Sequence, residues 1–376
     1  MKRRMKRFLP LLLALLLCLA GCGGRKEEAE KPDGEFSGSM PLRYAEQFTV
    51  DYYADGCALI TVGGEDRFLL VPEGQEPPQE TDPGVKVLRQ PVSSIYAASS
   101  SVMDLFLRAD ALDAVSMTST SAENWTIPEI RELVREDEIT YVGKYSAPDY
   151  EAVLDIGCDL AVENTMIWHN PQTKEQLERL GIPVLVELSS YESHPLGRVE
   201  WIKLYGLLTG HLAEAESFFE ESVRRLEEVE AQEASGKTVT FFYVTNSGTV
   251  NVRRPDDYVA EMIELAGGTY LFPEDLQVPE GAQSATEIQM ESFYAMAKDA
   301  DILIYNSTTQ TRLETMEDLL SLSPLFADFK AVRGRNVWCT EQNMFQQVGG
   351  TADMITDLHT VITGGQEPLQ YLHALD

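Results

Sequence analysis

Two glutamates stand in matching positions of two segments that share one pattern. Glu151 belongs to DYEAVLDIGCDLAVENT, residues 149–165, and Glu291 belongs to MESFYAMAKDADILIYNST, residues 290–308. Each segment indicates a short helix led by the glutamate and then a strand that begins at an aspartate. A carboxylate in the first turn of a helix is favoured by the macrodipole, and it can also form an ion pair with a basic partner. The repetition indicates two similar units, each with an acidic group in the same place.

Serine, cysteine and histidine residues form no catalytic motif in this sequence. It contains no G-x-S-x-G, no H-E-x-x-H and no histidine suitably placed beside a candidate nucleophile. The segment SGKT at 235–238 resembles a phosphate-binding loop, but Ala231 occupies the position of the first glycine, and the segment precedes a strand instead of following one. Cys57, Cys158 and Cys339 are odd in number and widely spaced, so we expect no disulfide framework and no zinc site. We therefore expect no enzyme activity.

The first 22 residues predict secretion and lipid anchoring. Five basic residues within the first seven precede FLPLLLALLLCLA, an apolar run too short for a permanent membrane span but typical of a signal peptide. The residues LAGC, which end at Cys22, resemble the lipobox of bacterial lipoproteins, in which the cysteine thiol receives diacylglycerol. We expect a lipoprotein signal peptide over 1–21, lipidation of Cys22 and a location at the extracytoplasmic face of the cell membrane. A plain secretory signal is the alternative.

The net charge limits the partners of the protein. Its 376 residues include 61 acidic and 30 basic side chains, which gives a net charge of −31. An acidic surface repels the phosphates of nucleic acids and anionic lipid headgroups, so we expect neither as a binding partner. The 44% hydrophobic content is typical of a packed globular protein, and the length favours two lobes over one core.

Residues 22–80 precede the alternating strands and helices and have a different composition. Residues 22–40 are charged and rich in glycine and serine, which predicts a flexible tether. Residues 41–80 alternate apolar and polar side chains between turn signals, which predicts a β extension of two or three antiparallel strands.

Strands and helices alternate through most of the remaining chain. The pattern predicts an N-terminal lobe over 81–198, whose first strand lies at 85–90, and a C-terminal lobe over 236–376. Residues 199–235 have helical spacing with an interruption at Gly210, and a single long helix here would tie the lobes together. The predicted fold class is α/β: two similar lobes with mainly parallel sheets, joined by a long rigid helix, plus a small N-terminal β extension.

Four segments in order resemble a known family. YEAVLDIGCDLAV, LERLGIPVLV, AEMIELAGGTYLF and MESFYAMAKDADILIY look like the substrate-binding lipoproteins of ABC importers for iron–siderophores and cobalamin, the class III binding-protein family. The resemblance covers residues 85–376, and 41–80 lies outside the common family core. It implies two lobes joined by one rigid helix and a surface glutamate on each lobe that docks against arginines of the permease. By their position within the motif, Glu151 of YEAVL and Glu291 of MESFY match those glutamates. A two-fold permease dimer presents the same basic socket twice, so its partner needs one carboxylate on each lobe.

Ligand contacts are expected in the loops that follow the strands. In open α/β sheets, ligands bind outside the carboxyl ends of the parallel strands. Aromatic side chains there offer flat apolar area to a bulky chelate, and arginines offer bidentate donors to an anionic one. The ligand-binding candidates are Ser100, Tyr145, Trp168, His169, Tyr191, Arg198, Arg253, Arg254, Asn306 and Met344. Trp201 fits a core position equally well, and Arg254 before Pro255 fits a solvated position.

The histidines favour a chelate over a bare metal ion. His211, His359 and His373 fall on expected helices away from the cleft, so at most His169, His194 and one carboxylate could converge on a metal. We expect no metal site and no cofactor. Haem, with His169 or Tyr191 as its axial ligand, stays open.

The resemblance implies an extracytoplasmic solute receptor of an ABC importer. We expect a monomer that binds a metal chelate and delivers it to the permease dimer with its ATPase subunits. A ferric siderophore is the first expectation, and a corrinoid or haem is the alternative within the same family. A lipoprotein enzyme or adhesion module with the same fold is the second alternative, and the β extension is what suggests it.

Overall fold

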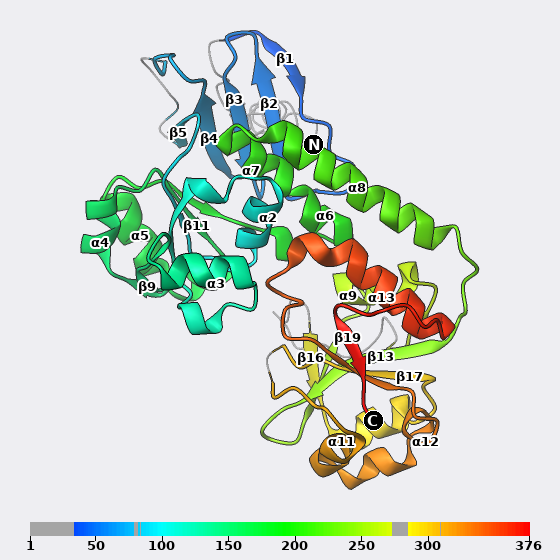
Figure 1. Ribbon diagram of the computed structural model, residues 1–376. Coiled ribbons are helices and arrows are strands. Elements are labelled where there is room, and N and C mark those ends of the chain that lie inside the picture. Colours follow the sequence, from blue (N-terminus) through cyan, green and yellow to red (C-terminus); the bar gives the residue numbers. More distant parts are fainter. Residues whose placement is uncertain (1–33, 79–81, 83, 273–284, 309) are drawn as a thin grey trace, which may run out of the picture.

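The computed structural model describes residues 34–78, 82, 84–272, 285–308 and 310–376. The expected signal peptide, Cys22 and most of the expected tether lie outside the described residues. Figure 1 shows an N-terminal sheet and two α/β lobes. Four helices lie between the lobes: α6 (Pro195–Glu200), α7 (Ile202–Thr209), α8 (Leu212–Glu230) and α13 (Thr351–Thr363). Within the described ranges, no helix has both the length and the apolar character needed to cross a membrane.

The N-terminal unit is a five-stranded sheet in the order β1-β2-β3-β4-β5. Its strands are β1 (Phe36–Ser39), β2 (Phe48–Tyr53), β3 (Ala58–Val62), β4 (Asp66–Val71) and β5 (Val85–Arg89). Strands β1 to β4 form antiparallel pairs, which confirms the antiparallel strands expected in this region.

Two strands of this sheet differ from the prediction. Residues 36–39 were expected in the tether, but they form β1 and pair with β2. Residues 85–90 were expected to open the first lobe, but β5 pairs in parallel with β4. The reason is burial: Val85 and Val87 of β5 pack on the outer face of the sheet against the buried Cys57, Leu69 and Val71.

The first lobe has a fully parallel sheet in the order β12-β11-β6-β7-β8. Its strands are β6 (Ile95–Ala97), β7 (Val115–Thr118), β8 (Thr140–Tyr141), β11 (Leu160–Glu163) and β12 (Val184–Val186). Its helices are α2 (Val102–Arg108), α3 (Pro128–Arg135), α4 (Tyr150–Ile156) and α5 (Pro171–Arg179). Every residue of β6, β11 and β12 is buried, as expected for strands covered on both faces.

The second lobe has a seven-stranded mixed sheet in the order β16-β14-β13-β17-β18-β19, with β15 paired to β13. Its strands are β13 (Thr238–Val244), β14 (Val250–Arg253), β15 (Thr269–Tyr270), β16 (Ala285–Ile288), β17 (Ile302–Tyr305), β18 (Val337–Thr340) and β19 (Leu372–Ala374). Its helices are α9 (Tyr258–Leu265), α10 (Met290–Ala297), α11 (Met316–Leu322), α12 (Lys330–Arg333) and α13 (Thr351–Thr363). The central strands β13, β17 and β18 are parallel, and antiparallel strands flank them.

One residue expected in a ligand-binding loop of this lobe lies in a strand. Arg253 is expected in a loop that follows a strand, but residues 250–253 form β14 and pair with β13. Val250 and Val252 are buried and alternate with the partly exposed Asn251 and Arg253, the pattern of a strand with one covered face.

The two lobes repeat one arrangement of elements. Helix α4 precedes the parallel pair β11 and β12, and helix α10 precedes the parallel pair β17 and β18. This repeat confirms the two similar lobes predicted from the sequence.

Three helices connect the lobes: α6 (Pro195–Glu200), α7 (Ile202–Thr209) and α8 (Leu212–Glu230). The expected single helix is divided at Gly210, which has a left-handed φ of 88° and ends α7. A Cβ at Gly206 would lie 2.6 Å from the Cβ of Ala215, so α7 and α8 pack in close contact there. We call α6, α7 and α8 together the connector, and α8, with 19 residues, is its longest helix.

Candidate functional site

One glutamine side chain bridges the two lobes. Gln346 lies in the loop after β18, and its Oε1 accepts hydrogen bonds from the backbone N–H of Thr126 at 2.8 Å and the Thr126 hydroxyl at 2.6 Å. Its Nε2 donates to the carbonyl of Asn124 at 2.8 Å. Trp125, which is fully buried, anchors this loop of the first lobe through a hydrogen bond from Nε1 to the Thr120 carbonyl. The loops after β7 and β18 therefore meet. Gln346 is not among the residues predicted from the sequence, because an amide between two loops carries no local pattern.

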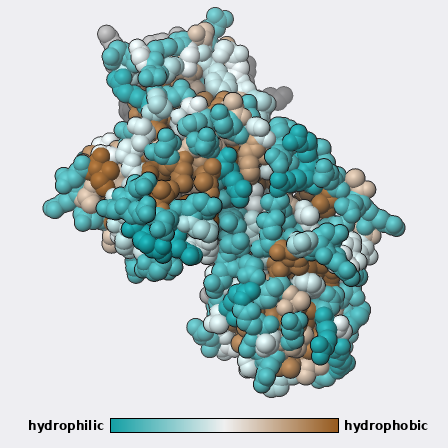
Figure 2. All heavy atoms as spheres, in the orientation of Figure 1, coloured by the Kyte–Doolittle hydropathy of each residue, from teal (hydrophilic) through white to brown (hydrophobic). Residues whose placement is uncertain are grey.

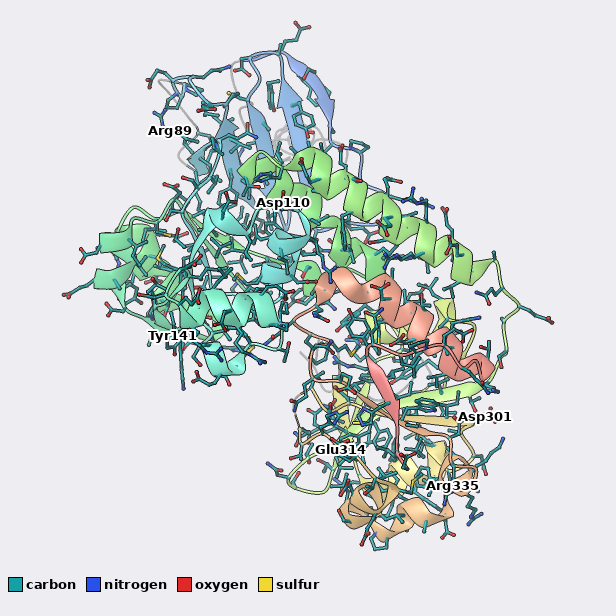
Figure 3. The ribbon with its side chains drawn as sticks, viewed as in Figure 1. Arg89, Asp110, Tyr141, Asp301, Glu314 and Arg335 are labelled. Carbon is teal, nitrogen blue, oxygen red and sulfur yellow. The ribbon has the colours of Figure 1, made fainter. Side chains whose placement is uncertain are left out.

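A second contact joins the lobes beside the connector. Asp104 on α2 is buried and accepts a hydrogen bond of 2.7 Å from the backbone N–H of Gly349. A Cβ at Gly349 would lie 2.9 Å from the Asp104 carboxylate, so this close approach requires glycine. Arg225 on α8 forms an ion pair with Asp353 on α13. Figure 3 shows Tyr141 on the first lobe and Glu314 on the second, on either side of the boundary between the lobes.

A cavity lies where the connector meets the second lobe, and it brings together two predicted residues. Arg198 of α6 and Met344 of the loop after β18 both line it. The other lining residues come from α9, the loop after β18, α13 and the C-terminal segment: Tyr258, Met262, Gln347, Gly350, Thr351, Met354 and Tyr371.

Two arginines lie near one aspartate beside this cavity. The guanidinium carbon of Arg198 lies 4.0 Å from the ring centroid of Tyr258. Arg253, at the end of β14, lies 3.8 Å from the carboxylate of Asp257 and 5.4 Å from the ring centroid of Phe345. Burial raises the pKa of the Asp257 carboxyl, while the charges of Arg253 and Arg198 act to lower it. The structure therefore brings Arg198, Arg253 and Met344 into one region rich in aromatic side chains.

Aromatic residues of the first lobe form a second group. Trp168 lies in the 3₁₀ helix Thr165–His169 after β11, and Tyr191 ends the 3₁₀ helix Ser189–Tyr191 after β12. Their ring centroids are 6.0 Å apart, and the Trp168 side chain is 53% exposed. His169 is exposed beside Trp168. Tyr145 is half-buried between the short strands β9 (Gly143–Lys144) and β10 (Ala147–Pro148), where it packs against the core.

The turn after β6 is fixed by a buried glutamate. Glu187 accepts hydrogen bonds of 3.1 Å from the hydroxyls of both Ser99 and Ser101, and its second oxygen accepts one from the backbone N–H of Ser189. Ser100 lies between the two serines and is half-buried. Glu187 thus positions the predicted residue Ser100. No local pattern predicts this support, because Glu187 lies 88 residues from Ser99 and 86 residues from Ser101 in the chain.

Three other candidates are held by local contacts. Arg254 forms an ion pair with Asp256 at 2.6 Å. Asn306 is only 1% exposed, and its Oδ1 accepts hydrogen bonds from the backbone N–H and the hydroxyl of Thr308, which fixes the turn after β17. Trp201 is fully buried in the core and donates from Nε1 to Glu192 at 2.8 Å. These contacts give Asn306 and Trp201 structural roles.

His194 lies in the junction with the N-terminal sheet. Its Nδ1 accepts a hydrogen bond from the backbone N–H of Leu196 and caps α6, and its ring stacks on Tyr44 with centroids 4.0 Å apart. Burial lowers the pKa of His194, which favours the neutral ring that this cap requires. Across the part of the chain that the structure describes, no three His, Cys, Asp or Glu side chains are placed to hold a metal ion.

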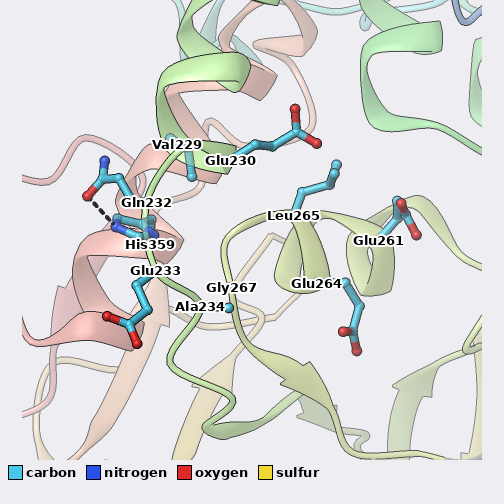
Figure 4. A pocket seen from close by; sticks show the side chains of 10 residues that line it. All are labelled: Val229, Glu230, Gln232, Glu233, Ala234, Glu261, Glu264, Leu265, Gly267 and His359. Carbon is cyan, nitrogen blue, oxygen red and sulfur yellow. Dashed lines mark hydrogen bonds between the residues drawn. The ribbon is translucent and has the colours of Figure 1, made fainter.

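Figure 4 shows a larger cavity of about 330 Å³ among α8, α9 and α13. Glu230, Glu233, Glu261 and Glu264 line it. The ring of His359 is held there between Gln232 and the carbonyl of Ala266. Its acidic lining does not suit an anionic chelate, and it lies away from the loops that join the lobes.

The chain is similar to several known proteins. A family model described as "Periplasmic binding protein" matches residues 95–343. The uncharacterized lipoprotein MJ0872 of Methanocaldococcus jannaschii is 23% identical over 398 residues, which cover 97% of each chain. The periplasmic heme-binding protein HutB of Vibrio cholerae has a TM-score of 0.58 and 18% identity, and the match covers 72% of this chain and 98% of HutB. The Fe3+-hydroxamate transport protein of Saccharomonospora viridis has a TM-score of 0.55 and 18% identity, over 72% of this chain and 93% of that chain.

Proposed function

Because this chain belongs to the periplasmic binding protein family, we propose that it is the lipid-anchored receptor of an ABC importer. In this proposal the receptor binds a metal chelate, a ferric siderophore first of all, at the extracytoplasmic face of the membrane. It delivers the chelate to the permease dimer and its ATPase subunits, and it catalyses no reaction. The lipoprotein name of the relative that spans nearly the whole chain supports the anchor at Cys22.

The observation that carries this proposal is that two similar lobes are in contact and that side chains suited to a chelate lie on the first lobe and beside the second. The aromatic pair Trp168 and Tyr191 offers flat apolar surface on the first lobe. Arg198 and Arg253 offer cationic groups beside the second lobe, in a chain whose net charge is −31. A large, partly apolar anion fits this combination better than a bare cation does.

The exposure of the two matching glutamates supports permease docking. Glu151 lies in the first turn of α4 and Glu291 in the first turn of α10, and both are exposed. Neither carboxylate forms an ion pair with a described residue. Both groups are therefore accessible to basic side chains of a permease.

The ligand within this class is proposed in the order ferric siderophore, corrinoid and haem. The neighbouring structures are named for heme and Fe3+-hydroxamate, and they share with this chain the fold alone. His169 is exposed and Tyr191 is half-buried, so either could approach a haem iron.

An absorbance titration tests the proposal. The purified protein, without its signal peptide, is mixed with ferric siderophores, cyanocobalamin or haemin, and free and bound chelate are separated by gel filtration. We expect one class to co-elute with the protein with its visible band shifted. If no chelate of any class co-elutes, the proposed receptor function is wrong, and the alternative of an enzyme or adhesion module gains weight.

A further inference from the structure

Arg198 is a buried cation that forms no ion pair with any acidic side chain in the part of the chain that the structure describes. Its side chain lies on α6, and the residue is 7% exposed. Its Nε is buried and has no hydrogen-bond partner, and no acidic side chain among the described residues forms an ion pair with it. The ring of Tyr258 lies 4.0 Å from its guanidinium carbon.

A buried arginine without an adjacent carboxylate destabilises the ligand-free protein. A buried charge loses its hydration, and a cation–π contact offsets only part of that loss. The nearest candidate for a counterion, Asp257, is already 3.8 Å from Arg253 and caps α9 through the backbone N–H of Val259. The chain holds 61 acidic residues, yet none of the described ones neutralises Arg198 directly.

The cavity beside Arg198 also receives the positive end of a helix. Gln347, Gly350 and Thr351 line it, and Thr351 is the first residue of the 13-residue helix α13. The N-terminus of such a helix attracts anions through its macrodipole. The backbone N–H of Thr351 donates to the carbonyl of Val348, and that of Gly349 donates to the buried Asp104. Asp353 in the same turn does not cancel this effect, because it forms an ion pair with Arg225 of α8.

The remaining walls are mainly apolar. Met262, Met344 and Met354 line the cavity. Apolar walls exclude water and strengthen the attraction between a cation and an anion, and methionine side chains adapt to irregular shapes. The cavity has room for about one water molecule, so it suits a single carboxylate oxygen of a ligand and not a whole chelate.

We propose that this cavity is an anion subsite, in which Arg198 and the N-terminus of α13 bind a carboxylate group of the ligand. The inference rests on the proposed receptor function and narrows it to chelates that carry a free carboxylate. Because the cavity is lined by the connector and by the second lobe, the bound carboxylate would hold these two parts together.

The stability of the ligand-free protein tests the role of Arg198 without any ligand. Arg198→Met keeps the length of the side chain but removes its charge, so we expect a melting temperature equal to or above that of the wild type. Arg198→Lys keeps a buried charge, and we expect it to melt no higher than the wild type. A fall of several degrees in Arg198→Met would mean that Arg198 stabilises the fold, and it would overturn the proposal.

Binding of chelates that differ in charge tests the ligand class. The probes are haemin against haemin dimethyl ester, and ferric citrate against a neutral ferric trihydroxamate, with cyanocobalamin as a further neutral probe. We expect binding of an anionic probe, about 100-fold weaker binding of its neutral counterpart, and a similar loss for the anionic probe in Arg198→Met. Arg333→Met, which removes an exposed arginine of α12, serves as the control and should bind as the wild type does.

The two possible failures can be told apart. Tight binding of a neutral chelate, or unchanged binding of the anionic chelate by Arg198→Met, overturns the anion subsite and leaves the receptor function in place. If no probe of either charge binds, the receptor function itself fails and the subsite falls with it.

Discussion

The backbone N–H of Tyr44 donates a hydrogen bond of 2.7 Å to the carboxylate of Glu200, a fully buried residue of α6. The same carboxylate accepts hydrogen bonds from the backbone N–H groups of Arg43 and Ala45 and forms an ion pair of 2.7 Å with Lys203. One side chain of the connector therefore holds the segment that enters the N-terminal sheet. This sheet lies outside the matched family region, which begins at residue 95, and Glu200 explains how it is fastened to the connector.

We expect Glu200→Ala to destabilise the protein strongly. The change leaves three backbone N–H groups without their acceptor and the buried Lys203 without its carboxylate, which costs about 3–5 kcal/mol in the free energy of unfolding. Urea denaturation measures the loss. The control is Glu227→Ala, because Glu227 pairs with the side chain of Arg43 at the exposed surface, where the expected loss is at most about 1 kcal/mol. Equal losses in the two variants would contradict this account.

Local sequence patterns predict many helices and strands of the lobes, but they do not predict contacts between residues far apart in the chain. Helix α13 follows from a local pattern, because its apolar residues recur with helical spacing and Gly364 ends it in a left-handed conformation. Strand β14 was missed, because its four residues of alternating burial were taken for part of a loop. The bonds of Glu200 to Arg43, Tyr44 and Ala45 join residues 155 to 157 positions apart, so no local pattern indicates them.

The sequence predicts only some residues of the candidate site, because the roles of the others depend on contacts between distant segments. Arg198 and Met344 were chosen separately for their residue types and do line one cavity. Gln346, Glu187 and Tyr258 were missed, because their roles arise only when segments far apart in the sequence come together.

Glu163 should make the stability of the protein depend on pH. It is fully buried at the end of β11, and neither of its carboxylate oxygens has a hydrogen-bond partner among the described residues. Burial raises the pKa of Glu163 to about 8, whereas a glutamate in an unfolded chain titrates near ~4.3. Between these values the folded protein binds more protons than the unfolded one, so its stability falls as the pH rises through this window and levels off above it.

We expect Glu163→Gln to remove this dependence, since glutamine does not ionise. The free energy of unfolding of the variant should match that of the wild type near pH 4 and exceed it by on the order of a few kcal/mol near pH 8. Urea denaturation at several pH values measures the difference. Glu187→Gln is the control: Glu187 is also buried, but its carboxylate accepts three hydrogen bonds, so we expect this change to destabilise. Parallel pH profiles for the wild type and Glu163→Gln would contradict the prediction.

Trp168 should report ligand binding through its fluorescence. Trp125 and Trp201 are fully buried and Trp338 is half-buried, whereas Trp168 is exposed beside Tyr191. A visible-absorbing chelate on this aromatic pair should quench Trp168. We expect Trp168→Phe to lose most of the quenching, and Trp168→Ala to bind about 5- to 30-fold more weakly because it loses aromatic contact area. Trp338→Phe should keep both the quenching and the affinity, and loss of the signal in that variant would show that another site is being observed.

Gln346 should hold the two lobes in their close arrangement. Its side chain makes three hydrogen bonds to Thr126 and Asn124 of the first lobe, and each contributes about 1 kcal/mol net. We expect Gln346→Ala to shift the free protein toward a more open arrangement, with a larger radius of gyration in X-ray scattering. Gln342→Ala, an exposed residue of the same loop, is the matched control and should scatter as the wild type does. An unchanged radius in Gln346→Ala would mean that other contacts hold the lobes.

Reversing the charge of both matching glutamates should impair delivery of the ligand to a permease and leave ligand binding unchanged. Glu151 and Glu291 are both exposed in first helical turns, and exposed Leu154 and Ile156 follow Glu151 on α4, where Figure 2 shows a hydrophobic patch. If basic residues of a permease receive both carboxylates, Glu151→Arg combined with Glu291→Arg places like charges together, which costs several kcal/mol. We expect uptake by cells that express the permease to fall more than tenfold, while the affinity of the purified variant for its chelate stays unchanged.

The controls for this experiment use the same chemistry at other helices. Glu129→Arg and Glu317→Arg reverse exposed charges in the first turns of α3 and α11, so they alter net charge and helix dipoles in the same way. If the control pair also abolished uptake, the effect would come from net charge and not from docking. If the Glu151 and Glu291 variants transported normally, the matching positions would reflect only the preference of a helix N-terminus for acidic residues. The contrast between the two pairs therefore decides whether the repeated glutamates form a docking surface, because both pairs satisfy the helix macrodipole and only one pair occupies matching places in the two lobes.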